Sequence, residues 1–476
     1  MRSAKIICTI GPASDRPEVL DKLIECGMDA ARLNFSHGTH DSHARAVKAI
    51  REAADRRRAA VAILQDLQGP RIRVGALGPD GVTLAPGQRV FLTGAAAHEP
   101  SGRAAAVTIP VTYPQIAKDV VAGARILIND GLVELRADAA TGQAVECTVV
   151  AGGLVTSHKG INLPGTQISA ATLTDKDRED LRFGIAHGVD YVALSFVRGP
   201  DDVRAAKKLI ADFGGDVPVI AKIERPEAID ALGAILQEAE GVMIARGDLG
   251  VEMGPEAVPV LQKRIIREAN RRRRLVITAT QMLESMTHNP TPTRAEASDV
   301  ANAVFDGTDA VMLSAETAVG RYPVETVRVM DRIIRAAEDE IERGPIRRSE
   351  QSPGEVSFPE AICTSASAAA SAIGAGAIVA FSELGMTARL LSKQRPAAPI
   401  IAFTPFETVL RRMALYWGVV PRTMLQIDQT DERMHEAECR LKAEGLASKG
   451  QRIVILSGTS IGQPGGTNLM KLHEIQ

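Results

Sequence analysis

The sequence VPVIAKIERPEAID at residues 217–230 is a short apolar run that ends in charged residues and leads into a helical pattern. The run Val217–Ile220 is rich in β-branched residues, which is typical of a buried strand. The next unit repeats this plan, because Val242–Ala245 is again short and apolar and ends in Arg246-Gly247-Asp248. A strand followed by a helix, repeated along a chain, predicts a parallel sheet with helices packed against it.

Eight such strands appear when the search moves outward from this segment. Helical stretches such as Pro17–Cys26 and Pro323–Arg335 follow nearly all of them. Eight is the number that closes a (β/α)₈ barrel, so we predict an α/β chain built on a TIM barrel; the alternative is a doubly wound sheet with extra strands. The strand candidates are Ile6–Ile10, Ala31–Phe35, Val61–Leu64, Tyr191–Leu194, Val217–Ile220, Val242–Ala245, Leu275–Thr278 and Ala310–Leu313.

One interval breaks the alternation. Between Pro70 and about Gln167 the pattern changes to short strands separated by turns, such as a hairpin around Asn129-Asp130-Gly131. We predict that this interval forms a small all-β domain, a β-barrel, inserted after the third barrel strand. An insertion at that point hangs over the barrel mouth, where it can act as a lid.

A third domain follows the barrel. A linker is predicted from the turn-forming residues Gly344-Pro345 and Ser352-Pro353-Gly354. From Ala361 onward, helical and strand-like segments alternate again. The predicted domains are the catalytic barrel (1–69 and 168–344), the β-lid (70–167) and a C-terminal α/β regulatory domain (345–476).

Composition narrows the possible partners and compartment. The chain has 476 residues, with 56 Lys and Arg against 58 Asp and Glu, so no overall field attracts nucleic acid or an anionic membrane. The runs Arg56–Arg58 and Arg271–Arg274 lie at predicted helix ends, where they complement the helix dipole.

The five scattered cysteines argue against a disulfide framework or a structural zinc site. No stretch approaches the roughly 20 apolar residues of a membrane span, and the first apolar run is too short for a signal peptide. We therefore expect a cytoplasmic protein.

Polar residues collect behind the predicted strands, at the end of a barrel where catalytic groups lie. Glu224 and Asp248 follow neighbouring strands, and such a sparse pair of carboxylates suits Mg²⁺ or Mn²⁺. Lys222 stands two residues before Glu224 and therefore points to the same side of its strand. A single Lys–Glu pair is ordinarily a salt bridge, but the second acid and the adjacent glycine turn favour a catalytic site. There Lys222 would neutralise a phosphoryl group or an enolate.

Further groups on this rim can bind a substrate. The glycines of Arg246–Gly250 allow a ligand to approach backbone amides that bind a carboxylate or phosphate. Thr280 adds a hydroxyl, and Ser195 follows the fourth strand. Arg32, Arg73 and Lys159 spread positive charge over the barrel rim and the lid, as binding of a polyphosphate requires. The sequence contains no Walker A motif.

Taken together, these segments resemble the pyruvate kinases. The similarity covers essentially the whole chain and is strongest in the barrel, and that family combines a barrel, a β-domain lid and a C-terminal α/β domain. It rests on ARLNFSHG (31–38), IAKIER (220–225), MIARGDLGVE (243–252), ATQMLESM (279–286), PTRAEASDVAN (292–302) and MLSAETA (312–318).

The resemblance implies transfer of the phosphoryl group of phosphoenolpyruvate to ADP, which yields pyruvate and ATP in the final step of glycolysis. It implies that Glu224 and Asp248 bind Mg²⁺ or Mn²⁺ and that Lys222 stabilises the transferring group and the enolate. Gly247, Asp248 and Thr280 would hold the substrate carboxylate, and Thr280 would also start a proton relay. Arg32 would contact the phosphate. Ser195 joins the substrate-binding set, and the residues implied for the nucleotide are Asn34, His37, Arg73 and Lys159.

The chain departs from potassium-requiring relatives after the third strand. Those members read Asp-Thr-Lys-Gly-Pro-Glu, whereas this chain reads DLQGPR at residues 66–71. The implied K⁺ ligands are Asn34, Ser36, Asp66 and the carbonyl of Leu67. Arg71 replaces the acid and brings a permanent positive charge in place of the cation. We therefore expect that K⁺ is not required.

Two other functions fit parts of the pattern. A metal-dependent barrel lyase acting on pyruvate or phosphoenolpyruvate would use the same acids without a nucleotide, but it would not need the lid or Lys159. A non-catalytic scaffold would not need Lys222, Glu224, Asp248 and Thr280 together. The resemblance also implies a homotetramer.

Overall fold

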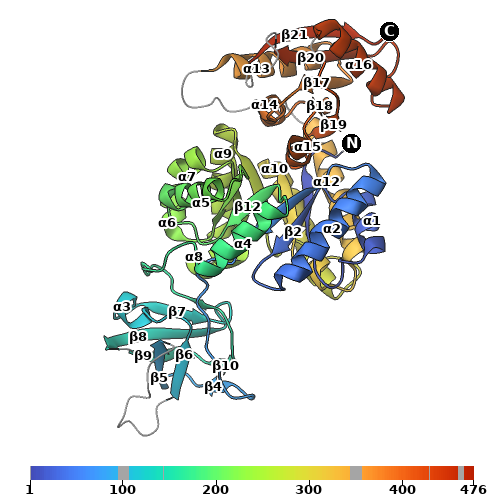
Figure 1. Cartoon of the computed structure of the whole chain (residues 1–476). Coiled ribbons are helices and arrows are strands. Elements are labelled where there is room, and N and C mark those ends of the chain that lie inside the picture. Colours follow the sequence, from blue (N-terminus) through green and yellow to red (C-terminus); the bar gives the residue numbers. More distant parts are fainter. Residues whose placement is uncertain (1, 95–106, 143, 344–355, 428, 459–465) are drawn as a thin grey trace.

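Eight parallel strands close into a barrel at the centre of the molecule (Figure 1). The computed structural model describes residues 2–94, 107–142, 144–343, 356–427, 429–458 and 466–476. Around the barrel the strands follow the order β1-β16-β15-β14-β13-β12-β3-β2, which confirms the (β/α)₈ prediction. Their bounds are β1 (Lys5–Thr9), β2 (Ala30–Asn34), β3 (Ala62–Asp66), β12 (Tyr191–Leu194), β13 (Val219–Ile223), β14 (Gly241–Ala245), β15 (Leu275–Ala279) and β16 (Ala310–Leu313).

Alternate residues of each strand face the barrel interior. Ile220 belongs to a buried cluster with Leu64 and Ala193, whereas Ala221 belongs to the cluster shared with the surrounding helices. Because side chains alternate along a strand, Lys222 and Glu224 follow Ile220 on the inner face. The same rule brings Asp66 inward after Leu64, and Ser195 inward after Ala193. Closure of the barrel thus gathers these polar groups at one mouth.

Helices surround the barrel, and several begin with a reciprocal side-chain cap. Thr39, Thr174 and Thr293 each accept a backbone N–H three residues further on, and the side chain there bonds back to the N-cap. In the described part of the chain, no helix is long and apolar enough to cross a membrane. The bounds are α1 (Pro17–Glu25), α2 (His40–Arg57), α4 (Asp175–Ala186), α5 (Pro200–Asp212), α6 (Pro226–Asp230), α7 (Leu232–Glu238), α8 (Arg246–Met253), α9 (Val258–Arg271), the 3₁₀ turn η1 (Glu284–Thr287), α10 (Arg294–Asp306), α11 (Ala315–Ala318) and α12 (Pro323–Arg343).

The inserted segment leaves the barrel after β3 and returns before α4, as predicted, and lies beyond one end of the barrel (Figure 1). The described strands form a six-stranded and a two-stranded sheet, with one short helix. Bridges from Val74 to Val111 of β6 and from Arg73 to Gly160, which precedes β11, join the two edges of the larger sheet. The small β-barrel stays a prediction. Period-two alternation predicts strands, but it does not decide whether their sheet closes. The elements are β4 (Val82–Leu84), β5 (Arg89–Gly94), β6 (Val107–Val111), α3 (Ile116–Asp119), β7 (Arg125–Ile128), β8 (Val133–Thr141), β9 (Ala144–Ala151), β10 (Gly153–Val155) and β11 (Ile161–Asn162).

The C-terminal domain lies at the opposite end of the barrel from the lid (Figure 1). It holds a five-stranded sheet of order β19-β18-β17-β20-β21, in which only the β20–β21 pair is antiparallel. The expected linker at 344–355 lies outside the described residues, and the three sets of domain limits remain predictions. The elements are α13 (Phe358–Ala372), β17 (Ala377–Phe381), α14 (Met386–Gln394), β18 (Ile400–Thr404), α15 (Glu407–Met413), β19 (Val419–Thr423), α16 (Thr430–Ala443), β20 (Arg452–Gly458) and β21 (Thr467–Glu474).

Apolar contacts and buried charges join this domain to the base of the barrel. Ala414 and Leu415 belong to the same buried cluster as the inner residues of the barrel strands. Asp309, which directly precedes β16 and is 0% exposed, forms ion pairs with Lys393 and, at 2.8 Å, with Arg395. A buried carboxylate therefore holds two cations of the C-terminal domain against the barrel.

We predict that Asp309→Asn destabilises the protein. The substitution leaves Lys393 and Arg395 without their counter-charge, and breaking a buried ion pair in this way costs about 3–5 kcal/mol. The urea midpoint should fall. Asp201→Asn is the control, because it removes a carboxylate that is 91% exposed in its pair with Arg204 and should leave the midpoint unchanged. Equal midpoints for the two variants would contradict the role of Asp309.

Candidate active site

A buried ammonium group stands at the centre of the barrel mouth. Lys222 Nζ lies 2.9 Å from Glu224 Oε1 and 3.2 Å from Asp66 Oδ1, and it donates a hydrogen bond of 2.7 Å to Ser195 Oγ. Arg32 Nε donates to the other oxygen of Asp66 at 2.7 Å. Strands β2, β3, β12 and β13 thus contribute to one cluster, as expected from the polar residues at the ends of these strands.

The electrostatics of this cluster favour its charged form. Burial lowers the pKa of Lys222, but the charges of Asp66 and Glu224 outweigh burial and raise the pKa overall. Burial raises the pKa of Asp66, but Lys222 and Arg32 outweigh that effect and lower it. The mouth therefore keeps a fixed positive charge on Lys222 over the physiological pH range.

Glu224 and Asp248 provide a pair of hard oxygen donors beside this ammonium. Glu224 is 1% exposed, and its Oε2 accepts the N–H of Phe196 at 2.8 Å. Burial raises the pKa of Glu224, and repulsion from the charge of Asp248 adds to this effect against the opposing charge of Lys222. A divalent cation would relieve this repulsion.

The donor chemistry suits Mg²⁺ or Mn²⁺ better than a structural metal. Within the described ranges, no group of three or more His, Cys, Asp or Glu side chains could hold an ion. Mg²⁺ sites commonly use one or two carboxylates and leave the other positions to water and substrate, which matches the chemistry of this pair.

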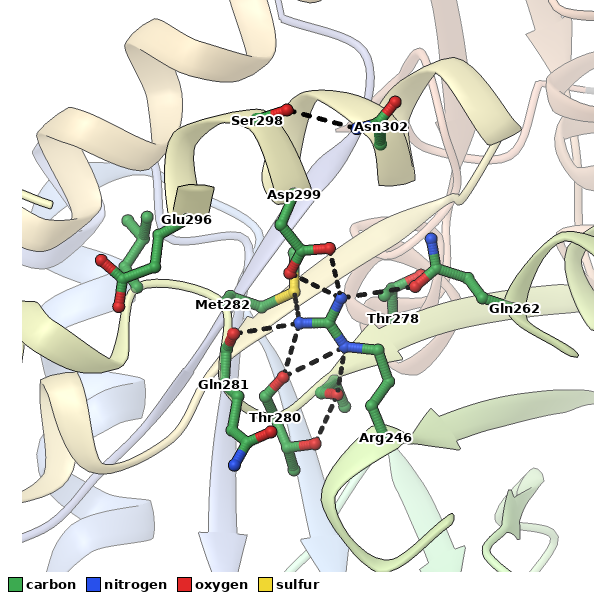
Figure 2. A network of polar contacts seen from close by, with 12 residues as sticks. Arg246, Gln262, Thr278, Thr280, Gln281, Met282, Glu296, Ser298, Asp299 and Asn302 are labelled. Atoms are coloured by element: carbon green, nitrogen blue, oxygen red, sulfur yellow. Dashed lines mark hydrogen bonds and ion pairs between the residues drawn. The ribbon is translucent and has the colours of Figure 1, made fainter. Parts of the chain in front are cut away.

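The Arg246 guanidinium points toward the turn that follows β15 and contacts Thr280, Gln281 and Asp299 there (Figure 2). It donates to the carbonyls of Thr280, at 2.7 Å, and Gln281, at 3.1 Å, and pairs with Asp299 at 2.7 Å. Thr280 and Gln281 both have positive φ angles, 68° and 53°, which non-glycine residues rarely adopt. The hydrogen bonds from Arg246 stabilise this strained turn.

The strained turn presents the Thr280 hydroxyl to the start of α8. Thr280 Oγ1 accepts the N–H of Gly247 at 2.9 Å and donates to the carbonyl of Ala279 at 2.7 Å. Thr280, Gly247 and Asp248 are therefore held side by side, as their predicted role in carboxylate binding requires.

Three of the four residues predicted to bind K⁺ have partners within the chain. Asn34 Oδ1 accepts the N–H of Ser36 at 3.2 Å, and the carbonyl of Leu67 accepts the Ser195 hydroxyl at 2.7 Å. Asp66 is held by Lys222 and Arg32, as described above. Arg71 lies elsewhere, with Nη2 3.9 Å from Asp248 Oδ1. Its charge enters the mouth beside the second acid, and the structure does not place it among the four predicted ligands.

The predicted nucleotide residues are less closely assembled. His37 is exposed, and partial burial together with the charges of Arg73, Arg71 and Arg32 lowers its pKa. Arg73 donates to the carbonyl of His158 at 3.0 Å, so it lies against the lid segment that precedes Lys159. The Lys159 side chain is exposed and has no hydrogen-bond or ion-pair partner in the described structure.

Several groups that support the site were not predicted from the sequence. Thr9 Oγ1 accepts a hydrogen bond of 3.0 Å from Arg32, and Phe196 uses a positive φ of 55° to aim its N–H at Glu224. Asn162 of the lid donates to Glu252 of α8 at 3.1 Å and links the two domains. Period-two alternation could have placed Thr9 on the inner face of β1, but backbone conformations and contacts between domains depend on the complete fold.

Comparison with known proteins gives a consistent result over the whole length. Residues 1–327 match the pyruvate kinase barrel domain and residues 360–473 the pyruvate kinase alpha/beta domain. The chain is 44% identical to a pyruvate kinase of Geobacillus stearothermophilus, covering 100% of this chain and 80% of that protein, and 44% identical to one of Mycobacterium tuberculosis, covering 98% of it.

A crystal structure of a pyruvate kinase from Cryptosporidium parvum superimposes with a TM-score of 0.91 at 36% identity, covering 100% of this chain and 96% of the other. Sequence, fold and the assembled mouth agree, and the chain belongs to the pyruvate kinase family.

Proposed function

We propose that the protein transfers the phosphoryl group of phosphoenolpyruvate to ADP and releases pyruvate and ATP. The observation that carries this proposal is the cluster of Lys222, Asp66, Glu224 and Arg32 at the barrel mouth. A loose phosphoryl-transfer transition state needs positioning and positive charge more than covalent chemistry. The cluster supplies both, because its acids fix the ammonium in place before substrate arrives.

Lys222 is the main electrostatic catalyst in this proposal. Its Nζ is buried among groups that keep it charged, so it needs little reorganisation when negative charge develops nearby. It would stabilise first the transferring phosphoryl group and then the enolate oxygen that remains. Arg32, held by Asp66 and Thr9, would bind the phosphate, and Ser195 would orient the ammonium through its hydrogen bond.

Glu224 and Asp248 would hold a Mg²⁺ or Mn²⁺ ion. When bound, the ion would neutralise negative charge on the substrate oxygens. The protein holds the Glu224 carboxylate in a fixed position for the ion, because the N–H of Phe196 and the ammonium of Lys222 both contact it.

The start of α8 and the turn after β15 would bind the substrate carboxylate. The N–H groups of Gly247 and Asp248 lie in the first turn of a helix, where backbone amides favour an anion, and the carboxylate would replace Thr280 Oγ1 as the acceptor of the Gly247 N–H. Thr280 would complete this site with its hydroxyl. The same hydroxyl would start the proton relay to the methylene carbon of the enolate, a step that forms the ketone.

The nucleotide would bind between barrel and lid. Asn34, His37 and Arg73 lie on the barrel side and at the hinge, and Lys159 would approach the phosphates from the lid. We further propose that the protein forms a homotetramer, as the resemblance implies. We also propose that it lies in the cytoplasm, where scattered, unpaired cysteines stay reduced.

We predict that Lys222→Met lowers kcat for ADP-dependent pyruvate formation by a factor of at least about 100, the usual loss when a preorganised electrostatic donor is removed. Pyruvate release is followed in a coupled assay, and circular dichroism checks that the variant is folded. Lys207→Met is the matched control, because Lys207 pairs with Glu240 on the outside of the barrel. Full activity of a folded Lys222→Met protein would favour a scaffold, and pyruvate formation without ADP would favour a lyase.

We also predict that activity does not require K⁺. Arg71 brings a permanent positive charge to the mouth, and three of the four predicted K⁺ ligands have partners within the chain. Activity should be unchanged when K⁺ is replaced by tetramethylammonium at constant ionic strength. Arg71→Glu should introduce activation by K⁺, because it restores the acid of potassium-requiring relatives. Strong activation of the unmodified protein by K⁺ would contradict the prediction.

A further inference from the structure

A helix outside the barrel reaches the turn that carries the Thr280 hydroxyl. The segment 292–302, which carries part of the resemblance, includes the first residues of α10. Glu296 and Asp299 are three residues apart in this helix and therefore share one of its faces. Figure 2 shows both acids on α10, with Asp299 directed at the Arg246 guanidinium. This face of α10 thus lies against the segment that follows β15.

Each of the two acids holds one part of that segment. Glu296 accepts the N–H of Ser285 at 2.7 Å and the hydroxyl of the same residue at 2.5 Å, which fixes the η1 turn. Asp299 lies with Oδ2 2.7 Å and Oδ1 2.8 Å from Nη1 of Arg246. In the described part of the chain, the Asp299 carboxylate has no other hydrogen-bond or ion-pair partner. Its removal would therefore act directly on Arg246.

The guanidinium of Arg246 carries this constraint to the strained turn. Because the group is planar, fixing Nη1 on Asp299 also fixes the directions of Nη2 and Nε. Nη2 donates to the carbonyls of Thr280 at 2.7 Å and Gln281 at 3.1 Å, and Nε donates to the carbonyl of Ala279 at 3.3 Å. Three consecutive carbonyls thus converge on one side chain, which maintains the left-handed conformation of the turn.

The backbone conformation of Thr280 decides where its hydroxyl points. A φ of 68° gives the side chain a direction that it would not have in an extended strand. In this orientation Oγ1 accepts the N–H of Gly247 at 2.9 Å, beside the proposed site for the substrate carboxylate. Asp299 is 38% exposed and lies on an outer helix, yet two contacts, through Arg246, connect it to the residue that carries this hydroxyl.

We propose that Asp299 is a positioning residue for proton transfer to the enolate, acting through Arg246 on Thr280. The proposal rests on the proposed function, in which the Thr280 hydroxyl starts the proton relay. In that step the C=C electron pair of the enolate takes the hydroxyl proton, the enolate oxygen becomes the ketone oxygen, and a proton from solvent restores the hydroxyl. Proton transfer needs a donor at hydrogen-bond distance, so relaxation of the turn would slow this step more than phosphoryl transfer, which Lys222 and Arg32 serve.

Asp299→Asn tests this role, because it removes the charge of the side chain and keeps its size. We expect kcat for pyruvate formation to fall by at least about tenfold, since a displacement of about 1 Å can cost a factor of about 100 in rate. The solvent deuterium isotope effect on kcat should rise, because the slowed proton transfer then limits turnover. A smaller fraction of folded protein would lower kcat but leave this isotope effect unchanged.

Two further variants and a control separate positioning from stability. Asp299→Glu keeps the carboxylate and should have a higher kcat than Asp299→Asn. Arg246→Lys keeps a cation but cannot reach all three carbonyls, so it should show the same rise in isotope effect, and it carries the test if Asp299→Asn does not fold. Asp21→Asn breaks a 3.0 Å pair with Arg56 between α1 and α2 and should change neither kcat nor the isotope effect.

The outcomes distinguish this inference from the proposed function. A folded Asp299→Asn or Arg246→Lys protein with an unchanged isotope effect would overturn the inference and leave the proposed function intact. An unmodified protein that forms no pyruvate from phosphoenolpyruvate and ADP would overturn the proposed function, and the inference with it.

Discussion

The buried ammonium of Lys222 is the constraint on which the rest of the site depends. A lysine taken out of water is costly unless anions surround it, and Asp66 and Glu224 meet that requirement at 3.2 Å and 2.9 Å. Both acids come from the strands on either side of β12, and parallel pairing brings the carboxyl ends of β3 and β13 to one rim of the barrel. Asp66 also anchors Arg32, and Glu224 is a proposed ligand of the divalent ion. The buried charge of Lys222 therefore depends on the barrel strands that place acids around it.

Backbone strain is a second feature of the active site, and residues around the strained positions maintain it. Phe196, Thr280 and Gln281 follow barrel strands in the left-handed conformation. Phe196 aims its N–H at Glu224, and Thr280 presents its hydroxyl to the N–H of Gly247. Each is maintained by a buried polar partner: Glu224 for Phe196, and Arg246 for the other two. Arg246 is itself fixed by Asp299 of α10, so a helix outside the barrel determines where Thr280 stands. The chain uses buried hydrogen bonds to stabilise conformations that would otherwise be unfavourable.

Much of this architecture could be predicted from the sequence, because it follows from periodicity. Lys222 and Glu224 share a face since they are two residues apart, and the eight strand–helix units imply a closed barrel that brings Asp66 to the same rim. The sequence did not predict the position of Arg71 or the role of Arg246. Their partners, Asp248 and the carbonyls of Thr280 and Gln281, depend on loop conformations that residue type does not encode.

The central claim is that Glu224 and Asp248 share one divalent ion beside Lys222. Direct titration with Mn²⁺, with free ion measured by electron paramagnetic resonance, tests it without relying on turnover. The account predicts one ion per chain, with affinity lowered by at least about tenfold in Glu224→Gln and in Asp248→Asn, as is typical when groups that hold a metal are changed. Glu227→Gln, which alters a nearby acid paired with Arg225, should bind Mn²⁺ normally. Unchanged Mn²⁺ affinity in Glu224→Gln and Asp248→Asn would contradict the account.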